Sequence, residues 1–161
     1  MHWVYRSSDF NVGTVGPVAC IAANGTMTAQ HAGGLSQAYA ALAASHGCFV
    51  AITVTTAKRP AISDEARASL AAIARQFREQ DLGTAVVLAQ PGFGATMVRA
   101  IVGGISILVG GNIKVFGDLD GGLGFLQELL AKEAVDGFDA AGIKAALVEL
   151  KPAEPAPSDV S

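Results

Sequence analysis

Apolar residues recur along this chain with two different periods, which predict alternating strands and helices. Aromatic and β-branched residues dominate positions 3–10 and 12–22, so we expect two adjacent strands or a hairpin there. The uninterrupted apolar run at 48–55 is typical of a central strand covered on both faces. Shorter apolar runs predict further strands at 83–90 and 113–116.

Between these strands the apolar residues change to helical spacing. Ser63 and Asp118 are the expected N-caps of two helices, because their side chains can accept hydrogen bonds from amides of the first turn. Gly47 is the expected C-cap of the first helix. The helices are predicted at 28–45, 63–80, 96–108, 118–130 and 136–150.

The resulting element order is β-β-α-β-α-β-α-β-α, which predicts an α/β fold with a single mixed β-sheet and packed helices. We expect one domain over residues 1–133 and an additional C-terminal helix within 134–150. Residues 151–161 contain three prolines among small polar residues, so we expect a disordered tail there.

Composition narrows the classes of protein that this chain can belong to. Its 161 residues suit one core, and its net charge of −3 argues against a dedicated nucleic-acid binder. The most apolar run, residues 100–113, is too short for a membrane span of roughly 20 residues. Because the first residues lack the pattern of a secretion signal, we expect a cytoplasmic protein.

The residues that could carry catalysis or bind a metal are few and scattered. Cys20, Cys48, His31 and His46 all lie within residues 10–57, a stretch without any Asp, Glu, Lys or Arg. We therefore expect no catalytic residues, no metal site and no cofactor. Both cysteines are expected in strands of the core, and both histidines on helix surfaces.

A turn between a predicted strand and a predicted helix offers a possible anion site. Gly92, Gly94 and Thr96 lie where backbone amides and a helix N-terminus could face a phosphate. The turn lacks the third glycine of a dinucleotide fingerprint and the lysine of a P-loop, which favours an ordinary strand-to-helix turn.

The predicted order resembles that of a known family. Supporting positions are the strand Phe49 to Thr55, the loop into Ser63-Asp64-Glu65-Ala66-Arg67, the strand Ala85 to Leu88, Met97 to Ile101, Val115-Phe116, and Gly124-Phe125-Leu126. Over residues 3–130 the chain resembles the STAS superfamily, and particularly its SpoIIAA-like branch of anti-sigma-factor-antagonist relatives.

This resemblance implies a regulatory protein that binds a protein partner, such as a kinase or another signalling protein. Partner-switching relatives carry a phosphorylated Ser or Thr in an Asp-Ser-Ser/Thr-Gly loop after the central strand, and residues 55–64 lack that tetrapeptide. Ser63 matches by position only, and a role as an N-cap is favoured because it explains a serine there completely. The resemblance gives the following candidates for a recognition loop: Thr55, Thr56, Lys58, Arg59, Ser63 and Asp64.

The charge-free stretch gives a second candidate surface. The predicted helix at 28–45 can offer solvent only neutral side chains, among them Gln30, His31, Gln37 and Ala41. Because charged residues are depleted at the centre of homo-oligomer interfaces, this face predicts self-association or binding of a dedicated partner. The alternative is an alanine-rich helix that is merely neutral.

These observations favour a non-enzymatic regulatory or scaffolding module that acts through protein–protein interaction. The alternative is a domain that binds a small ligand, a nucleotide or a lipid, through the loop 90–96.

Overall fold

The computed structural model of this chain describes residues 1–56, 61–89, 96, 99–100 and 111–152. Within these residues the strands are β1 (His2–Arg6), β2 (Phe10–Val15), β3 (Val18–Ala23), β4 (Phe49–Thr55), β5 (Asp81–Leu88) and β6 (Ile113–Phe116). The helices are α1 (Ala29–His46), α2 (Asp64–Gln76), α4 (Leu119–Lys132) and α5 (Ala140–Leu150).

All the described strands form one six-stranded sheet in the order β1-β2-β3-β4-β5-β6. Strand β2 pairs antiparallel with both β1 and β3, whereas the pairs β3–β4, β4–β5 and β5–β6 are parallel. The sheet is therefore mixed, and β4 lies inside it between β3 and β5. This confirms the predicted fold class and the central position of the apolar run at 49–55.

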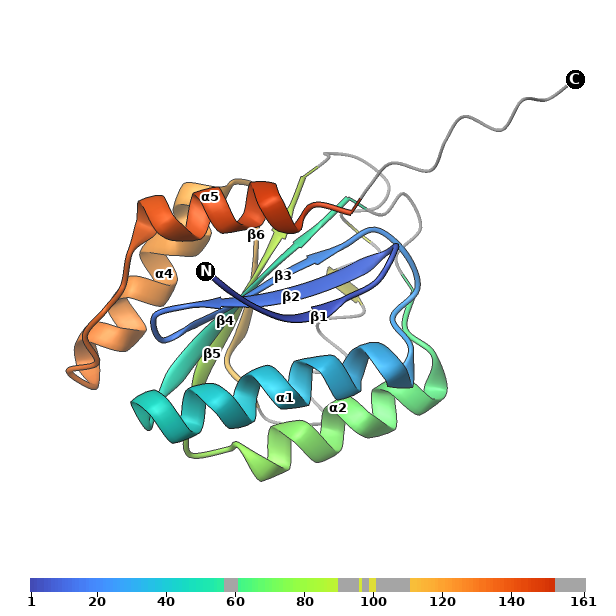
Figure 1. The fold of residues 1–161 in the computed structure, drawn as a ribbon, viewed down its shortest axis with the longest axis horizontal. Coiled ribbons are helices and arrows are strands. Elements are labelled where there is room, and N and C mark those ends of the chain that lie inside the picture. Colours follow the sequence, from blue (N-terminus) through green and yellow to red (C-terminus); the bar gives the residue numbers. More distant parts are fainter. Residues whose placement is uncertain (57–60, 90–95, 97–98, 101–110, 153–161) are drawn as a thin grey trace, which may run out of the picture.

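Helices cover both faces of the sheet, with α1 and α2 on one side and α4 and α5 on the other (Figure 1). Alternate residues of β4 serve the two layers: Phe49 and Ala51 join the core under α1 and α2, whereas Val50 and Ile52 join the core under α4 and α5. Two covered faces explain why this strand has no polar alternation in its first half.

The N-terminal segment contains three strands where two were predicted. The apolar stretch at 12–22 is not one strand, because Gly16 and Pro17 turn the chain between β2 and β3. Gly16 has a φ of +52°, and a Cβ at this position would collide with the carbonyl oxygen of Gly137. The predicted order beginning β-β-α is thus corrected to β-β-β-α.

The predicted helix caps are confirmed, although two helix boundaries differ from the prediction. Ser63 accepts a hydrogen bond from the amide of Ala66 over 3.1 Å, and Asp118 caps α4 in the same way. Gly47 has a φ of +76° where α1 ends. Helix α2 ends at Gln76, before the predicted residue 80, and α5 begins only at Ala140 because Asp139 is its N-cap.

Helix α5 packs Ile143 and Leu150 into the same core as α4. The division of the chain near residue 133 stays a prediction. The helix predicted at 96–108 falls largely outside the described residues, and the predicted disorder of the tail concerns residues that lie almost wholly outside them. Within the described residues, no helix combines the length and the apolar character that crossing a membrane requires.

Candidate functional site

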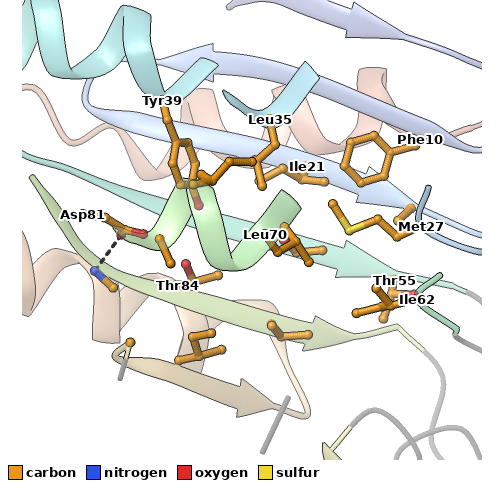
Figure 2. Close-up of a pocket in the computed structure, with 18 of the residues that line it drawn as sticks. Phe10, Ile21, Met27, Leu35, Tyr39, Thr55, Ile62, Leu70, Asp81 and Thr84 are labelled. Atoms are coloured by element: carbon orange, nitrogen blue, oxygen red, sulfur yellow. Dashed lines mark hydrogen bonds between the residues drawn. The ribbon is translucent and has the colours of Figure 1, made fainter. Parts of the chain in front are cut away.

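The candidate functional site is a cavity on the α1/α2 face of the sheet. It has a volume of about 380 Å³ and lies between these helices and strands β3 to β6 (Figure 2). The register of β4, β5 and β6 places Thr53, Val86 and Ile113 on this face, where they line the cavity. Its size lies within the range of about 300–1,000 Å³ typical of small-molecule sites.

One end of the cavity is apolar. Phe10 and Ile21 reach it from β2 and β3, and Leu35 and Leu70 reach it from α1 and α2. Met27 and Ile62 also line this end, and the two residues are joined by an isolated parallel β-bridge. This end can therefore hold a hydrocarbon group away from water.

The other end of the cavity is polar. Asp81, Thr84 and Tyr39 gather there, from the start of β5 and from α1 (Figure 2). The Asp81 Oδ1 atom accepts a hydrogen bond of 3.1 Å from the Gly83 amide. The Tyr39 phenol points towards the Thr84 side chain (Figure 2).

Burial controls the ionisation of this polar end. Loss of water contact raises the pKa of the Asp81 carboxyl to about 6, while the hydrogen bond from Gly83 acts in the opposite direction. Burial also raises the pKa of the Tyr39 phenol, and the nearby Asp81 charge adds to this effect. At neutral pH the cavity thus presents a carboxylate and a protonated phenol.

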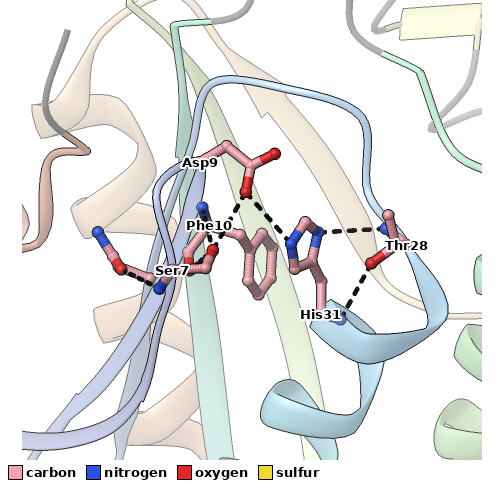
Figure 3. Close-up of polar contacts among 6 residues, drawn as sticks. Ser7, Asp9, Phe10, Thr28 and His31 are labelled. Atoms are coloured by element: carbon pink, nitrogen blue, oxygen red, sulfur yellow. Dashed lines mark hydrogen bonds and ion pairs between the residues drawn. The ribbon is translucent and has the colours of Figure 1, made fainter. Parts of the chain in front are cut away.

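A separate polar cluster surrounds His31 at the start of α1 (Figure 3). Its Nε2 atom lies 3.3 Å from Asp9 Oδ1, and its ring stacks on Phe10 with the centroids 4.8 Å apart. The prediction of a surface position for His31 is wrong, because only 6% of the residue is exposed. Asp9 ends the loop just before the charge-free stretch and supplies the acid that this stretch lacks.

The contacts of His31 identify it as a structural residue. Its Nδ1 atom accepts a hydrogen bond of 3.2 Å from the Thr28 amide, while Thr28 Oγ1 accepts one from the His31 amide. This reciprocal pair is a capping box for α1. Since Nδ1 accepts and Nε2 faces Asp9, neither ring nitrogen is free to act as a general base.

The described residues of the predicted recognition loop lie in different surroundings. Thr55 lines the cavity and Thr56 is half-buried, whereas Ser63 is the N-cap of α2 and Asp64 is exposed on its first turn. Lys58 and Arg59 lie outside the described residues.

The predicted interface of α1 is only partly at the surface. Gln30, Gln37 and Ala41 are exposed, whereas His31 belongs to the buried cluster. Of the predicted anion site, Gly92 and Gly94 lie outside the described residues, and Thr96 is exposed.

The cysteines and the acidic residues form no reactive centre in the described part of the chain. Cys20 is fully buried as predicted, and burial raises the pKa of its thiol to about 12, which keeps it protonated. Cys48 is only half-buried, contrary to its expected core position. Among the described residues, no three His, Cys, Asp or Glu side chains converge to hold a metal ion.

Sequence reasoning missed the cavity and its polar end. Asp81 is the only charged residue in β5, and this isolated acid at the start of a mostly apolar strand was the available signal. The contribution of Tyr39 could not be recognised, since its helical spacing with Leu35 and Leu42 is also that of a core residue.

Comparison with known proteins supports the fold. No family model matches the chain, and no curated protein matches it in sequence. Among solved structures, the chain is similar to an uncharacterized protein of the DUF3478 family from Shewanella loihica PV-4, described as having a SpoIIAA-like fold. The TM-score is 0.50 at 14% identity, over 73% of this chain and 91% of that one. The chain therefore has a SpoIIAA-like fold, as its element order predicted.

Proposed function

We propose that this chain is a non-enzymatic regulatory module that binds a small amphipathic molecule in the cavity between α1, α2 and the sheet. The observation that carries the proposal is a cavity of about 380 Å³ with one apolar and one polar end. Ligand sites commonly combine a mostly apolar lining with a few polar groups that orient the ligand. This site differs from the loop 90–96 to which the sequence assigned the small-ligand alternative.

Non-catalytic binding also agrees with the chemistry of the lining. Among the described residues, the polar groups that line the cavity are one carboxylate, one phenol, one guanidinium, one amide and several threonine hydroxyls, with no cysteine or histidine. Within the described residues, no nucleophile lies beside a general base at this cavity. The proposal therefore assigns binding to the site and no bond-making step.

A pair of substitutions on α2 tests occupancy of the cavity. Ala74 lines the cavity, so Ala74→Phe fills part of its volume, whereas Ala72 is exposed on the same helix and lines nothing. We expect the neutral dye Nile red to bind the parent protein with increased fluorescence. Ala74→Phe should abolish this signal, and the matched Ala72→Phe should retain it. Equal dye binding by both variants would contradict binding in the cavity.

Interaction with another protein is the second function that we propose, and the exposed face of α1 supports it. This face carries Gln30, Gln37 and Ala41, and no Asp, Glu, Lys or Arg lies anywhere in the helix. A surface without charges has little desolvation cost on association. We take a second copy of this chain as the partner of this face, because the same neutral patch on both copies brings no charge repulsion.

Charge insertion tests this second function. Gln37→Glu and Ala41→Lys should shift a dimer towards monomer without lowering the melting temperature, since each charge must lose water on association. Ala72→Lys places the same charge on exposed α2 and is the control. Light scattering over a concentration series measures the effect. If the parent protein stays monomeric at high micromolar concentration, the proposal of self-association is wrong.

A further inference from the structure

We propose that the polar end of the cavity selects a ligand whose head group donates hydrogen bonds, a primary amine or a hydroxyl on a short hydrocarbon chain, and rejects a carboxylate. This inference rests on the proposed binding function and names the class of ligand that the cavity takes.

The inference starts from the acceptor that the cavity leaves available. Asp81 Oδ1 accepts the Gly83 amide, but Oδ2 has no hydrogen-bond partner among the residues that the structure describes. Asp81 also lines the cavity, so this oxygen can be reached from it. A carboxylate oxygen that can be reached from the cavity can accept a hydrogen bond from a bound ligand. An ammonium or hydroxyl group on the ligand supplies the donor.

The charges around Asp81 favour a donor head group over an acid. Besides Asp81, the titratable side chains that line the cavity are Tyr39 from α1 and Arg78 from the turn after α2. Arg78 is exposed, and it makes no ion pair with Asp81 within 4.0 Å in the described structure. In the described structure no cation of the protein therefore lies in contact with the Asp81 carboxylate, and a ligand carboxylate placed directly beside it would be repelled.

The remaining polar groups at this end agree with a donor head group. The Tyr39 phenol points towards Thr84, and burial keeps it protonated at neutral pH. The opposite end, with Met27, Leu35 and Leu70, then receives the hydrocarbon chain. The arrangement of the two ends thus sets both the polarity of the ligand and its direction in the cavity.

Three probes of equal chain length separate the head groups. Octylamine, octanol and octanoate are titrated into the protein by calorimetry at pH 7.5, where Asp81 is ionised. We expect octylamine to bind about tenfold or more tightly than octanoate, because a hydrogen bond to a charged group is stronger than one between neutral groups. Octanol should bind with intermediate affinity.

Substitution of the acid assigns the preference to Asp81. Asp81→Asn keeps an oxygen that can accept from Gly83 but removes the charge, so octylamine should lose about tenfold in affinity while octanol changes little. Glu79→Gln is the matched control, because Glu79 is an exposed acid two positions away that does not line the cavity. Its affinities should equal those of the parent.

Several outcomes would overturn the inference. Octanoate binding as tightly as octylamine would do so, and so would equal losses of octylamine affinity in the Asp81 and Glu79 variants. Absence of binding by all three probes would also overturn it. The Nile red comparison of the Ala74 and Ala72 variants decides separately whether the cavity binds any apolar molecule, so the two proposals fail on different measurements.

Discussion

Asn11 in β2 and Leu150 at the end of α5 are joined by a hydrogen bond of 2.7 Å, although 139 residues separate them along the chain. The Asn11 Nδ2 atom donates to the Leu150 carbonyl, one of the last carbonyls of α5, which lack partners within the helix. The Asn11 Oδ1 atom accepts the Ser7 amide over 3.0 Å. One buried side chain thus ties the C-terminal helix to the N-terminal hairpin.

This hydrogen bond predicts the effect of changing Asn11. Asn11→Asp keeps the acceptor for Ser7 but removes the donor to Leu150, so it should lower the free energy of unfolding by about 1–3 kcal/mol. Urea denaturation followed by circular dichroism measures the change. Asn11→Ala removes both contacts and should cost at least as much. An unchanged denaturation midpoint for both variants would show that this contact does not hold α5 in place.

Two neighbouring glycines of α1 should respond oppositely to the same substitution. Gly33 is exposed with open space around it, so Gly33→Ala should stabilise the protein by about 0.5–1 kcal/mol through helix propensity. A Cβ at Gly34 would lie 2.5 Å from Tyr5 Cγ, so Gly34→Ala should destabilise by about 1–3 kcal/mol. Thermal unfolding of the two variants measures both signs. If both substitutions stabilise the protein, Tyr5 does not pack against Gly34.

The cap of α2 gives a prediction about Ser63. Ser63→Ala should lower stability by about 0.5–2 kcal/mol, because the Ala66 amide loses its acceptor. Ser63→Asp can still accept that hydrogen bond and should restore most of the loss. Ser69 lies inside the same helix and caps nothing, so Ser69→Ala is the control for the loss of a hydroxyl. If Ser63→Ala leaves stability intact but abolishes partner binding, Ser63 is a regulatory site instead of a cap.

Ionisation of Asp81 predicts a pH dependence of stability. Burial raises its pKa from 3.8 to about 6, so the folded protein binds a proton that the unfolded chain releases between about pH 4 and pH 6. The contribution of this group to stability is therefore complete below pH 4 and is lost as the pH rises through 6. Asp81→Asn should remove this decline, giving a larger gain in stability at pH 7.5 than at pH 4.

The control for this pH dependence is Glu79→Gln, which removes an exposed acid near Asp81. Urea denaturation at a series of pH values compares the two variants with the parent. The difference in unfolding free energy between Asp81→Asn and the parent should grow between pH 4 and pH 6 and then stay constant. A difference that is independent of pH would mean that the Asp81 carboxyl is not buried.

The sequence by itself determined the mixed α/β sheet, its central strand and the ends of several helices. These are local consequences of the pattern: the apolar run at Phe49–Thr55 needs cover on both faces, and Ser63 and Asp118 satisfy amides only a few residues away. The turn at Gly16 and Pro17, which separates β2 from β3, was not predicted because the residues on both sides of it form one apolar stretch in the sequence.

Only the tertiary structure decided the position of the cavity and the burial of His31. Asp81 and Thr84 come from β5 and Tyr39 comes from α1, and the packing of α1 over the paired strands β4 and β5 brings them to one place. The pattern of the helix that contains His31 is compatible with either a surface or a core position for this residue. His31 is buried because it contacts Asp9 and Phe10, which lie more than twenty residues earlier in the chain. Periodicity reports which side of an element is apolar, but not which other element faces that side.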